Sequence, residues 1–569
     1  MTLSISSSGT SRPAKIFISL LKNSAHNIRQ LGQIFAQTIT TGCIYCPLTW
    51  NSIIRAYSKS PTPIKAILIY NHIIKPTTFV VLPDNHTYPA LLKACSRLPS
   101  LPKAKEIHGH LTKSGLLHSD IYINNSLIHL YRTLGQAKDA RRVFDEMYHR
   151  DLVSWNSVLG VYSSCPDLWV EALVLFKRML YVGVEADAVT IIILLSACGL
   201  VREGIEYGRA IHAYVMKVGI GFSLNLENSL LSLYSKGGDM NTAIRLFNEM
   251  MGQRDVASCT ILINGYVGLG LVDQAREIFD RMDVKDHVSW NSMINGYVKA
   301  NQPKEALELF KEMEMDDVSP DEKTVVSLLS ACACLSELRL GRLVHNFIIE
   351  RNIRFDVFVG TALVNMYAKC GSLEEAMVTF HKLDYKDVFT WTTAVTALAN
   401  YGRGNEALML FREMQKEGIE PNEATFVAVL TACSQSGLVE EGCELFNSMH
   451  RLFSIQPRIE HFGCLVDLLS RAGLLSHAEK FVRTMPVDEK IIAYKTILSA
   501  CISYFDIELG ENVAKEMIKL RPQSHGVYVL LSNFYALANQ WDKVVEMRRI
   551  MKESSMRKEI GISFIDIKT

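Results

Sequence analysis

The segment Val-Ser-Trp-Asn-Ser occurs twice in this chain, at residues 153–157 and again at 288–292. Related Trp-containing segments begin at Thr49 and Thr390. The same apolar pattern follows each segment, and a relative of the segment itself follows about 31 or 35 residues later. Self-similarity at such a period predicts that one small unit has been copied many times. The fold of this chain must therefore arise from the stacking of repeats rather than from separate cores.

One repeat, residues 287–321, predicts a pair of helices. Pro303 interrupts its apolar pattern and suits the first position of a second helix. A helix pair of about 35 residues cannot bury both of its faces, so neighbouring repeats must complete one continuous core. We therefore expect an all-α fold, a superhelical solenoid of helix–turn–helix repeats. The apolar residues at helical spacing are Trp290, Met293, Ile294 and Tyr297, then Ala306, Leu309, Phe310 and Met313.

Three forms of the repeat alternate between residues 47 and 490. The long form contains Trp-Asn or Trp-Thr and covers 47–84, 152–187, 287–321 and 388–422. The middle form contains Leu-Leu-x-Ala-Cys or similar, then Gly-x-x-Ile-His, and covers 85–120, 188–223, 322–356 and 423–458. The short form contains Asn-Ser-Leu-Ile-x-x-Tyr or a relative and covers 121–151, 224–255, 256–286, 357–387 and, divergently, 459–490. Residues 31–46 resemble part of a degenerate repeat.

The N-terminal region differs from the rest of the chain in charge. Residues 1–83 contain eight Lys/Arg and no acidic residue, whereas the remainder contains 52 Lys/Arg against 59 Asp/Glu. Residues 1–30 are Ser-rich and mildly basic, with an apolar face at 16–21, which is typical of an organelle transit peptide. The alternative is a disordered N-terminus. No apolar run approaches the ~20 residues that span a bilayer, so we expect no membrane segment.

The cysteines and histidines predict packing rather than metal binding. The chain contains 13 cysteines, an odd and scattered set that argues against a disulfide framework. Cys43 and Cys46 form a lone CxxC, whereas zinc needs four ligands. We expect no metal and no cofactor. Five cysteines share one position of the repeat and are expected to be small buried residues, and three histidines share another: Cys95, Cys198, Cys332, Cys433 and Cys501, then His108, His212 and His345.

The alternation resembles that of the plant pentatricopeptide repeat proteins of the PLS class. The matching motifs are Trp-Asn-Ser-x-Ile, Leu-Lys-Ala-Cys, Met-Tyr-Ala-Lys-Cys-Gly at 366–371 and Lys-Glu-Ala-Leu-Glu-Leu-Phe-Lys-Glu-Met at 304–313. The resemblance covers about residues 28–569. Residues 491–559 resemble the family's E-type extension of two repeat-like units, in the segments 526–533 and 541–544 above all. Residues 560–569 form a C-terminal tail.

The resemblance implies binding of single-stranded organelle RNA, with one repeat per base. In the family, the fifth and the last residue of a repeat recognise the base. Five pairs here would favour U: Asn51/Asp84, Asn125/Asp151, Asn156/Asp187, Asn228/Asp255 and Asn291/Asp321. Thr260/Asp286 and Thr361/Asp387 would favour G, and Thr392/Asn422 would favour A. Pro89, Ile192, Val326, Val427 and the pair Gly463/Lys490 assign no base, so the expected target is 5′-UnUUnUGUnGAnn-3′.

These polar residues also have a purely structural interpretation. Asn, Thr and Asp are favoured at helix caps and turns, where their side chains bind backbone N–H groups. The base-recognition interpretation rests on Asn or Thr recurring in one position, directly after Trp in the long repeats. An Asp at the end of a repeat can serve both purposes.

The sequence predicts an adaptor rather than an enzyme. Full-length relatives carry a deaminase-like domain, and zinc deaminases need His-x-Glu followed by Pro-Cys-x-x-Cys. Here His477-Ala478-Glu479 is followed by a single cysteine, Cys501. We expect a monomeric site-recognition factor for C-to-U RNA editing that recruits a deaminase in trans through residues 491–569, in the mitochondrion or alternatively the chloroplast. A non-editing factor for splicing, stability or translation is the second hypothesis, and a protein-binding scaffold is the third.

Overall fold

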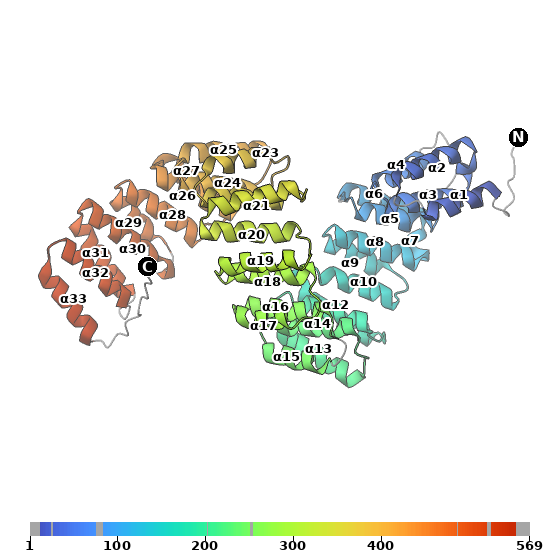
Figure 1. The fold of residues 1–569 in the computed structure, drawn as a ribbon, viewed down its shortest axis with the longest axis horizontal. Helices are drawn as coiled ribbons and strands as arrows, with labels where there is room; N and C mark the ends of the chain where they lie inside the picture. Colours follow the sequence, from blue (N-terminus) through green and yellow to red (C-terminus); the bar gives the residue numbers. More distant parts are fainter. Residues whose placement is uncertain are drawn as a thin grey trace. The chain divides into compact units, whose positions relative to one another are not determined.

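The computed structural model describes residues 12–23, 27–74, 83–98, 100–201, 203–250, 254–485, 487–520 and 525–553. Residues 1–11, which belong to the expected transit peptide, lie outside this range. The expected C-terminal tail, residues 560–569, also lies outside it. The described residues form helices and connecting turns, with no strand among them. The chain divides into two compact parts, Met1–Lys285 and Asp286–Thr569, each a stack of helix pairs (Figure 1).

The helices of the first part form consecutive pairs along the chain. Each expected repeat from 47 to 286 contains one such pair. Their bounds are α1 Arg12–Asn23, α2 Ile28–Thr40, the 3-10 helix η1 Cys43–Tyr45, α3 Pro47–Lys59, α4 Ile64–Ile74, α5 Thr87–Ser96, α6 Leu101–Ser114, α7 Leu116–Ser119, α8 Ile121–Thr133, α9 Ala137–Glu146, α10 Leu152–Tyr162, the 3-10 helix η2 Pro166–Leu168, α11 Trp169–Tyr181, α12 Ala188–Cys198, α13 Gly204–Val218, α14 Leu224–Lys236, α15 Met240–Glu249, α16 Val256–Gly268 and α17 Val272–Asp280.

The second part continues the same scheme through the remaining repeats and the C-terminal extension. Its helices are α18 His287–Lys299, α19 Pro303–Met315, α20 Glu322–Leu335, α21 Leu338–Glu350, α22 Val357–Lys369, α23 Leu373–Lys382, α24 Val388–Asn400, α25 Gly404–Lys416, α26 Glu423–Ser436, α27 Val439–Phe453, α28 Ile459–Arg471, α29 Leu475–Arg483, α30 Val487–Tyr504, α31 Ile507–Leu520, α32 His525–Leu537 and α33 Trp541–Glu553. The expected all-α solenoid of helix pairs is confirmed.

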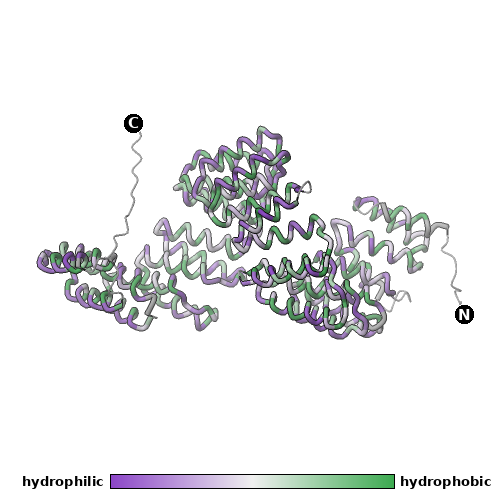
Figure 2. Tube along the Cα trace, turned by 90° about the horizontal axis from the view of Figure 1, so that it is seen from below, coloured by the Kyte–Doolittle hydropathy of each residue, from purple (hydrophilic) through white to green (hydrophobic). Residues whose placement is uncertain are grey.

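Each part is organised in two layers of helices. The first helices of consecutive repeats pack on one another, as α8 does on α10 and α22 on α24, and each second helix packs on the first helices of its own and the next repeat. Hydrophobic and hydrophilic residues are interspersed along the helices (Figure 2). One core cluster extends over several repeats of the first part, from Leu21 to Leu233, and another extends over the second part from Val325 to Met547, instead of closing within one repeat.

The recurring tryptophan belongs to this core, as its helical spacing predicts. Trp155 and Trp290 are each 2% exposed. The ring of Trp155 lies edge-on to Phe144 at 4.8 Å, and Trp391 lies edge-on to Phe380 at 5.0 Å. Trp155 and Trp391 thus each pack on the second helix of the repeat before them. The five cysteines that share one position are also buried, as expected.

The acid-free N-terminal segment includes a helix in the structure. Residues Arg12–Asn23 form α1, which packs on α3, and Leu21 is buried in the core of the first part. These residues are helical rather than disordered. Among the described residues, no helix combines the length and the hydropathy that crossing a membrane requires.

A glycine recurs where the second helix of a middle repeat meets the first helix of the next repeat. A Cβ on Gly208 would overlap the side chain of Leu233, which occupies the space that a larger residue would need. The same holds for Gly341 against Met366. By contrast, Gly109 on α6 would meet no atom within 4 Å.

Replacement of Gly208 by Val should destabilise the chain by about 1–3 kcal/mol, because the added methyl groups overpack a buried helix contact. The same replacement at Gly109 is the control and should change the free energy of unfolding by less than ~0.5 kcal/mol. Urea unfolding followed by circular dichroism measures both. Equal effects of the two substitutions would show that the helix contact at Gly208 is not tight.

Candidate nucleic-acid interface

The last residue of each repeat that carries an expected recognition pair accepts a hydrogen bond from the first residues of the next repeat. Ser154 donates its backbone N–H to Asp151 Oδ1 at 2.8 Å, and Thr324 donates to Asp321 Oδ1 at 2.9 Å. Such N-caps satisfy backbone groups that have no partner within the helix. The capping interpretation is therefore correct for this position. The other cap bonds of this kind involve Asp84, Asp187, Asp255, Asp286, Asp387 and Asn422.

The same carboxylates also meet the asparagine in the fifth position of their own repeat. Asn291 donates through Nδ2 to Asp321 Oδ1 at 2.9 Å. The pairs expected from the sequence therefore come together in space, although their members lie about thirty residues apart. The corresponding distances are 3.0 Å for Asn51–Asp84, 3.2 Å for Asn156–Asp187 and 3.3 Å for Asn228–Asp255, and Asn125 also hydrogen-bonds Asp151.

The threonine pairs are connected less directly. Thr361 shares a hydrogen bond of 2.7 Å with the hydroxyl of Thr390, which in turn donates to Asp387 at 2.8 Å. Thr392 and Asn422 are linked in the same way through Thr425. A threonine is too short to reach the carboxylate, so a neighbouring hydroxyl spans the gap.

Thr260 differs from both other threonines of the set. Its hydroxyl donates to the carbonyl of Val256 at 2.7 Å, within its own helix. Its expected partner Asp286 caps α18 in the second part of the chain.

Hydrogen bonds keep the paired carboxylates ionised. Burial alone would raise the pKa of Asp187, but the Thr190 backbone N–H, the Thr190 hydroxyl and Asn156 outweigh it and hold this pKa below its usual value. The pKa values of four other carboxylates are lowered by the same balance, those of Asp84, Asp151, Asp255 and Asp321. At neutral pH these side chains are acceptors only.

The fifth position of the middle repeats offers no hydrogen-bonding group. Pro89, Ile192, Val326 and Val427 are half-buried and apolar. In the last short repeat Gly463 has no side chain, and Lys490 donates to the carbonyl of Arg483 at 2.9 Å. The structure thus gives no polar contact by which these repeats could distinguish bases.

Two further rows of residues lie on the same face of the first helices as the fifth positions. The sequence analysis did not single them out. The second position of the first helix, one turn before the fifth, repeatedly exposes an apolar side chain. The thirteenth position, three turns after the second, repeatedly exposes a cation at the helix end. The apolar row comprises Leu48, Tyr122, Val153, Val189, Val288, Phe358 and Phe389. The cationic row comprises Lys59, Lys236, Lys299, Lys369 and Arg471.

A groove between α12 and α14 brings these positions together. It has a volume of about 550 Å³ and is lined by Ile192 and Asn228, both in fifth positions, with Asn225 in a second position and Lys236 in a thirteenth. Their period in the sequence was a signal that could have identified both rows. A cation at a helix C-terminus also stabilises the helix, so the cationic row has a structural role as well.

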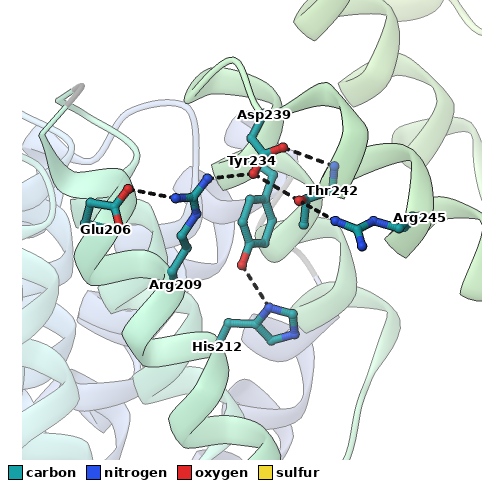
Figure 3. Close-up of polar contacts among 7 residues, drawn as sticks. All are labelled: Glu206, Arg209, His212, Tyr234, Asp239, Thr242 and Arg245. Atoms are coloured by element: carbon teal, nitrogen blue, oxygen red, sulfur yellow. Dashed lines mark hydrogen bonds and ion pairs between the residues drawn. The ribbon is translucent and has the colours of Figure 1, made fainter.

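The recurring histidines lie away from these rows and pack as expected. His212 Nδ1 lies 3.0 Å from the hydroxyl of Tyr234 on the next helix pair, beside an ion pair of 2.8 Å between Arg209 and Asp239 (Figure 3). His108 and His345 contact their tyrosines at 2.8 and 2.7 Å. Burial lowers the pKa of all three histidines. Nowhere in the described ranges do three or more His, Cys, Asp or Glu side chains gather as a metal site would require.

Family models match the chain in three ways. The model described as PPR repeat family matches residues 285–334 and 386–435. The model described as PPR repeat matches 125–152, 228–254, 257–287, 361–388 and 424–452. The model described as E motif matches 504–566.

Curated relatives come from Arabidopsis thaliana. The pentatricopeptide repeat-containing protein At4g33170 is 34% identical over 92% of this chain, which spans about half of that relative (49%). The mitochondrial protein At2g22410 is 36% identical over 91% of this chain and 76% of its own length. The chloroplastic protein At1g08070 is 33% identical over 91% of this chain and 70% of its own length.

Solved structures share the fold. The pentatricopeptide repeat protein PPR10 from maize superimposes with a TM-score of 0.54 at 17% identity, over 95% of this chain and 83% of that one. PPR10 in complex with an 18-nt psaJ RNA element superimposes with a TM-score of 0.53 at 15% identity, over 96% of this chain and 88% of that one.

Asp187→Ala should lower the free energy of unfolding by about 1 kcal/mol, because α12 loses its cap, whereas Asp187→Asn should keep most of it. Asn422 already caps α26 in this manner. Folding lowers the pKa of Asp187, so its negative charge stabilises the fold at any pH above the pKa of the unfolded state, about 3.9. This stabilisation is lost as the pH falls through the pKa of the folded state. The difference in free energy of unfolding between the wild type and Asp187→Asn should therefore shrink in acid. Unfolding curves at pH 7 and in acid provide the check, and a pH-independent difference would contradict it.

Proposed function

The chain belongs to the pentatricopeptide repeat family, and on that premise we propose that it binds single-stranded RNA of a plant organelle in a sequence-specific manner. The observation that carries the proposal is a recurring exposed apolar side chain. In most repeats with a polar pair, it lies one helical turn before the fifth position. Val153 is 58% exposed, Phe358 68% and Phe389 70%. Soluble proteins seldom expose large apolar residues in a regular row without a ligand for them.

Nucleotide bases are suited to this row. A base can lie between the apolar side chains of two successive repeats, and such stacking contributes roughly 1–3 kcal/mol per base without regard to sequence. The polar pair then faces the edge of the stacked base. The exposed cations of the thirteenth position lie on the same side and suit the phosphates, although the chain as a whole is close to neutral.

The chemistry of the pairs accounts for base preference. An ionised Asp only accepts hydrogen bonds and fits the N3–H of U or the N1–H of G. The amide of Asn422 can donate and so fits the N1 acceptor of A. Asn in the fifth position extends further than Thr. The longer Asn leaves room for a pyrimidine, and the shorter Thr leaves room for a purine. The proposed target remains 5′-UnUUnUGUnGAnn-3′, with the sixteen paired residues as its recognition set.

The E motif supports a role as a site-recognition factor in C-to-U editing. On this proposal the repeats select the RNA, and the C-terminal region, residues 491–569, recruits a deaminase in trans. We place the protein in the mitochondrion or alternatively the chloroplast, as the names of the two relatives suggest, and propose that it acts as a monomer. The second candidate, a factor for splicing, stability or translation, would use the same RNA-binding face without the deaminase.

Replacing Asn291 with Thr should move the preference of one repeat from U towards G and leave the other positions unchanged. The shorter side chain leaves room for a purine, while Asp321 still accepts from the ring N–H. Gel-shift titration against RNA oligonucleotides that vary only at this base measures the preference. An unaltered preference would refute the alignment of repeats with bases.

Loss of the protein should abolish one C-to-U event, at a cytidine a few bases downstream of the target sequence. Organelle transcriptome sequencing of a null mutant would detect it. Mis-spliced or missing transcripts with intact editing would instead support the second candidate.

A further inference from the structure

A buried hydroxyl accompanies the recognition pairs. Thr324, the third residue of α20, donates its hydroxyl to Asn291 Oδ1 at 2.6 Å, although Asn291 lies in the preceding repeat. Thr324 is fully buried. The same bond occurs from Thr87 to Asn51 at 2.6 Å, from Thr190 to Asn156 at 2.7 Å and from Ser258 to Asn228 at 2.7 Å.

The hydroxyl completes a closed set of hydrogen bonds. Asn291 donates from Nδ2 to Asp321, and its Oδ1 accepts from Thr324. A rotated amide would point Oδ1 at the carboxylate, which only accepts hydrogen bonds, and would lose the bond to Asp321. It would also no longer offer Thr324 an acceptor, so the hydroxyl would be left to donate to Asp321 Oδ1, which lies 3.0 Å away. Thr324 Oγ1 in turn accepts from the backbone N–H of Asp321 at 3.1 Å. Each pair is therefore held by the repeat that follows it.

The distribution of hydroxyls along the sequence follows the recognition residues. Each of the eight repeats with Asn or Thr in the fifth position is followed by a repeat with Ser or Thr in the third position. After the repeats with Pro89, Ile192, Val326, Val427 or Gly463 in the fifth position, the third residue is never Ser or Thr. It is Ile123, Leu226, Val359, His461 or Ala493.

Capping alone does not explain this distribution. Helices α8 and α22 are capped by Asp120 and Asp356, yet their third residues are Ile123 and Val359. From repeat 85–120 onward, the hydroxyl is present where a polar recognition residue precedes it and absent where none does. A requirement of the helix end would place it everywhere.

From this we infer that the third residue of each following repeat is a positioning residue for base recognition, which fixes the orientation of the Asn amide. The inference rests on the proposed function. It extends the recognition set from two residues to three, with Thr87, Thr190, Ser258 and Thr324 as the positioning residues of four U-specific repeats. With its Oδ1 and one Nδ2 hydrogen engaged, the amide presents its second N–H in a constant direction.

Asn125 is the exception within the chain. The hydroxyls of Thr190 and Thr324 lie within hydrogen-bond distance of both the Asn amide and the carboxylate. The hydroxyl of Ser154 contacts only Asp151 Oδ1, at 2.7 Å, and Asn125 Oδ1 is buried with no hydrogen-bond partner in the part of the chain that the structure covers. The inference therefore expects the repeat 121–151 to discriminate U less sharply than the repeat 287–321 in the unaltered protein.

The test uses Thr324→Val, which keeps the shape of the side chain and removes the hydroxyl. It should reduce the preference for U at the base assigned to repeat 287–321 by about three- to tenfold, the range expected for one hydrogen bond. The preference at the base of repeat 357–387, measured with the same full-length preparation, should not change. Thr324→Ser should restore discrimination, as Ser258 shows that serine can make this bond.

Thr49→Val is the matched control. Thr49 is also the third residue of its helix and is fully buried, but its hydroxyl has no hydrogen-bond partner among the residues described. This substitution should leave every base preference unchanged. Fluorescence-anisotropy titrations against four oligonucleotides that differ at the one base measure each variant, and circular dichroism verifies the fold.

Two outcomes would overturn the inference. A Thr324→Val protein that binds all four oligonucleotides more weakly by one common factor would show a purely structural hydroxyl, with the RNA-binding proposal intact. A folded wild-type protein with no base preference at this position would contradict the proposed function itself. Loss of U preference in Thr324→Val but not in Thr324→Ser or Thr49→Val would support the inference.

Discussion

The unsatisfied N–H groups at the start of each first helix constrain everything else in this molecule. Each such helix end needs an acceptor, and the last residue of the preceding repeat supplies it, as Asp187 does for α12. That requirement fixes where the carboxylate sits relative to the helix that follows. Because the carboxylate also meets Asn156, the cap sets at once the position of the residue that we propose recognises a base.

Packing and recognition occupy different faces of the same helix. In α18 the indole of Trp290 lies in the core, while the adjacent Asn291 reaches towards Asp321. Since successive residues of a helix point about 100° apart, one can stabilise the stack while its neighbour varies. On the proposed function, a change at the fifth position would alter the contact with a base and leave the core intact. One scaffold could then carry many different base preferences.

Much of the fold followed from spacing alone. Trp290, Met293 and Ile294 recur on one helix face, and all three are buried where the pattern predicts. The repeat length required stacking, because one helix pair leaves both faces apolar. The buried state of Cys332 and the packing role of His345 followed from recurrence at one position. The pairing of Asn291 with Asp321 came from the family resemblance, since no local pattern connects residues thirty positions apart.

Other features depend on which atoms of adjacent repeats meet. The sequence alone determined the helix pairs, their order and the residues that line each face, because these follow from the helical period and the chemistry of burial. Only the tertiary structure decided that Thr361 reaches its carboxylate through Thr390, that Thr260 turns back to its own helix, and that Thr324 holds the amide of Asn291. A difference of one or two bond lengths between side chains decides each of these contacts. Sequence period defines a face of the helix, but the approach of neighbouring helices sets those distances.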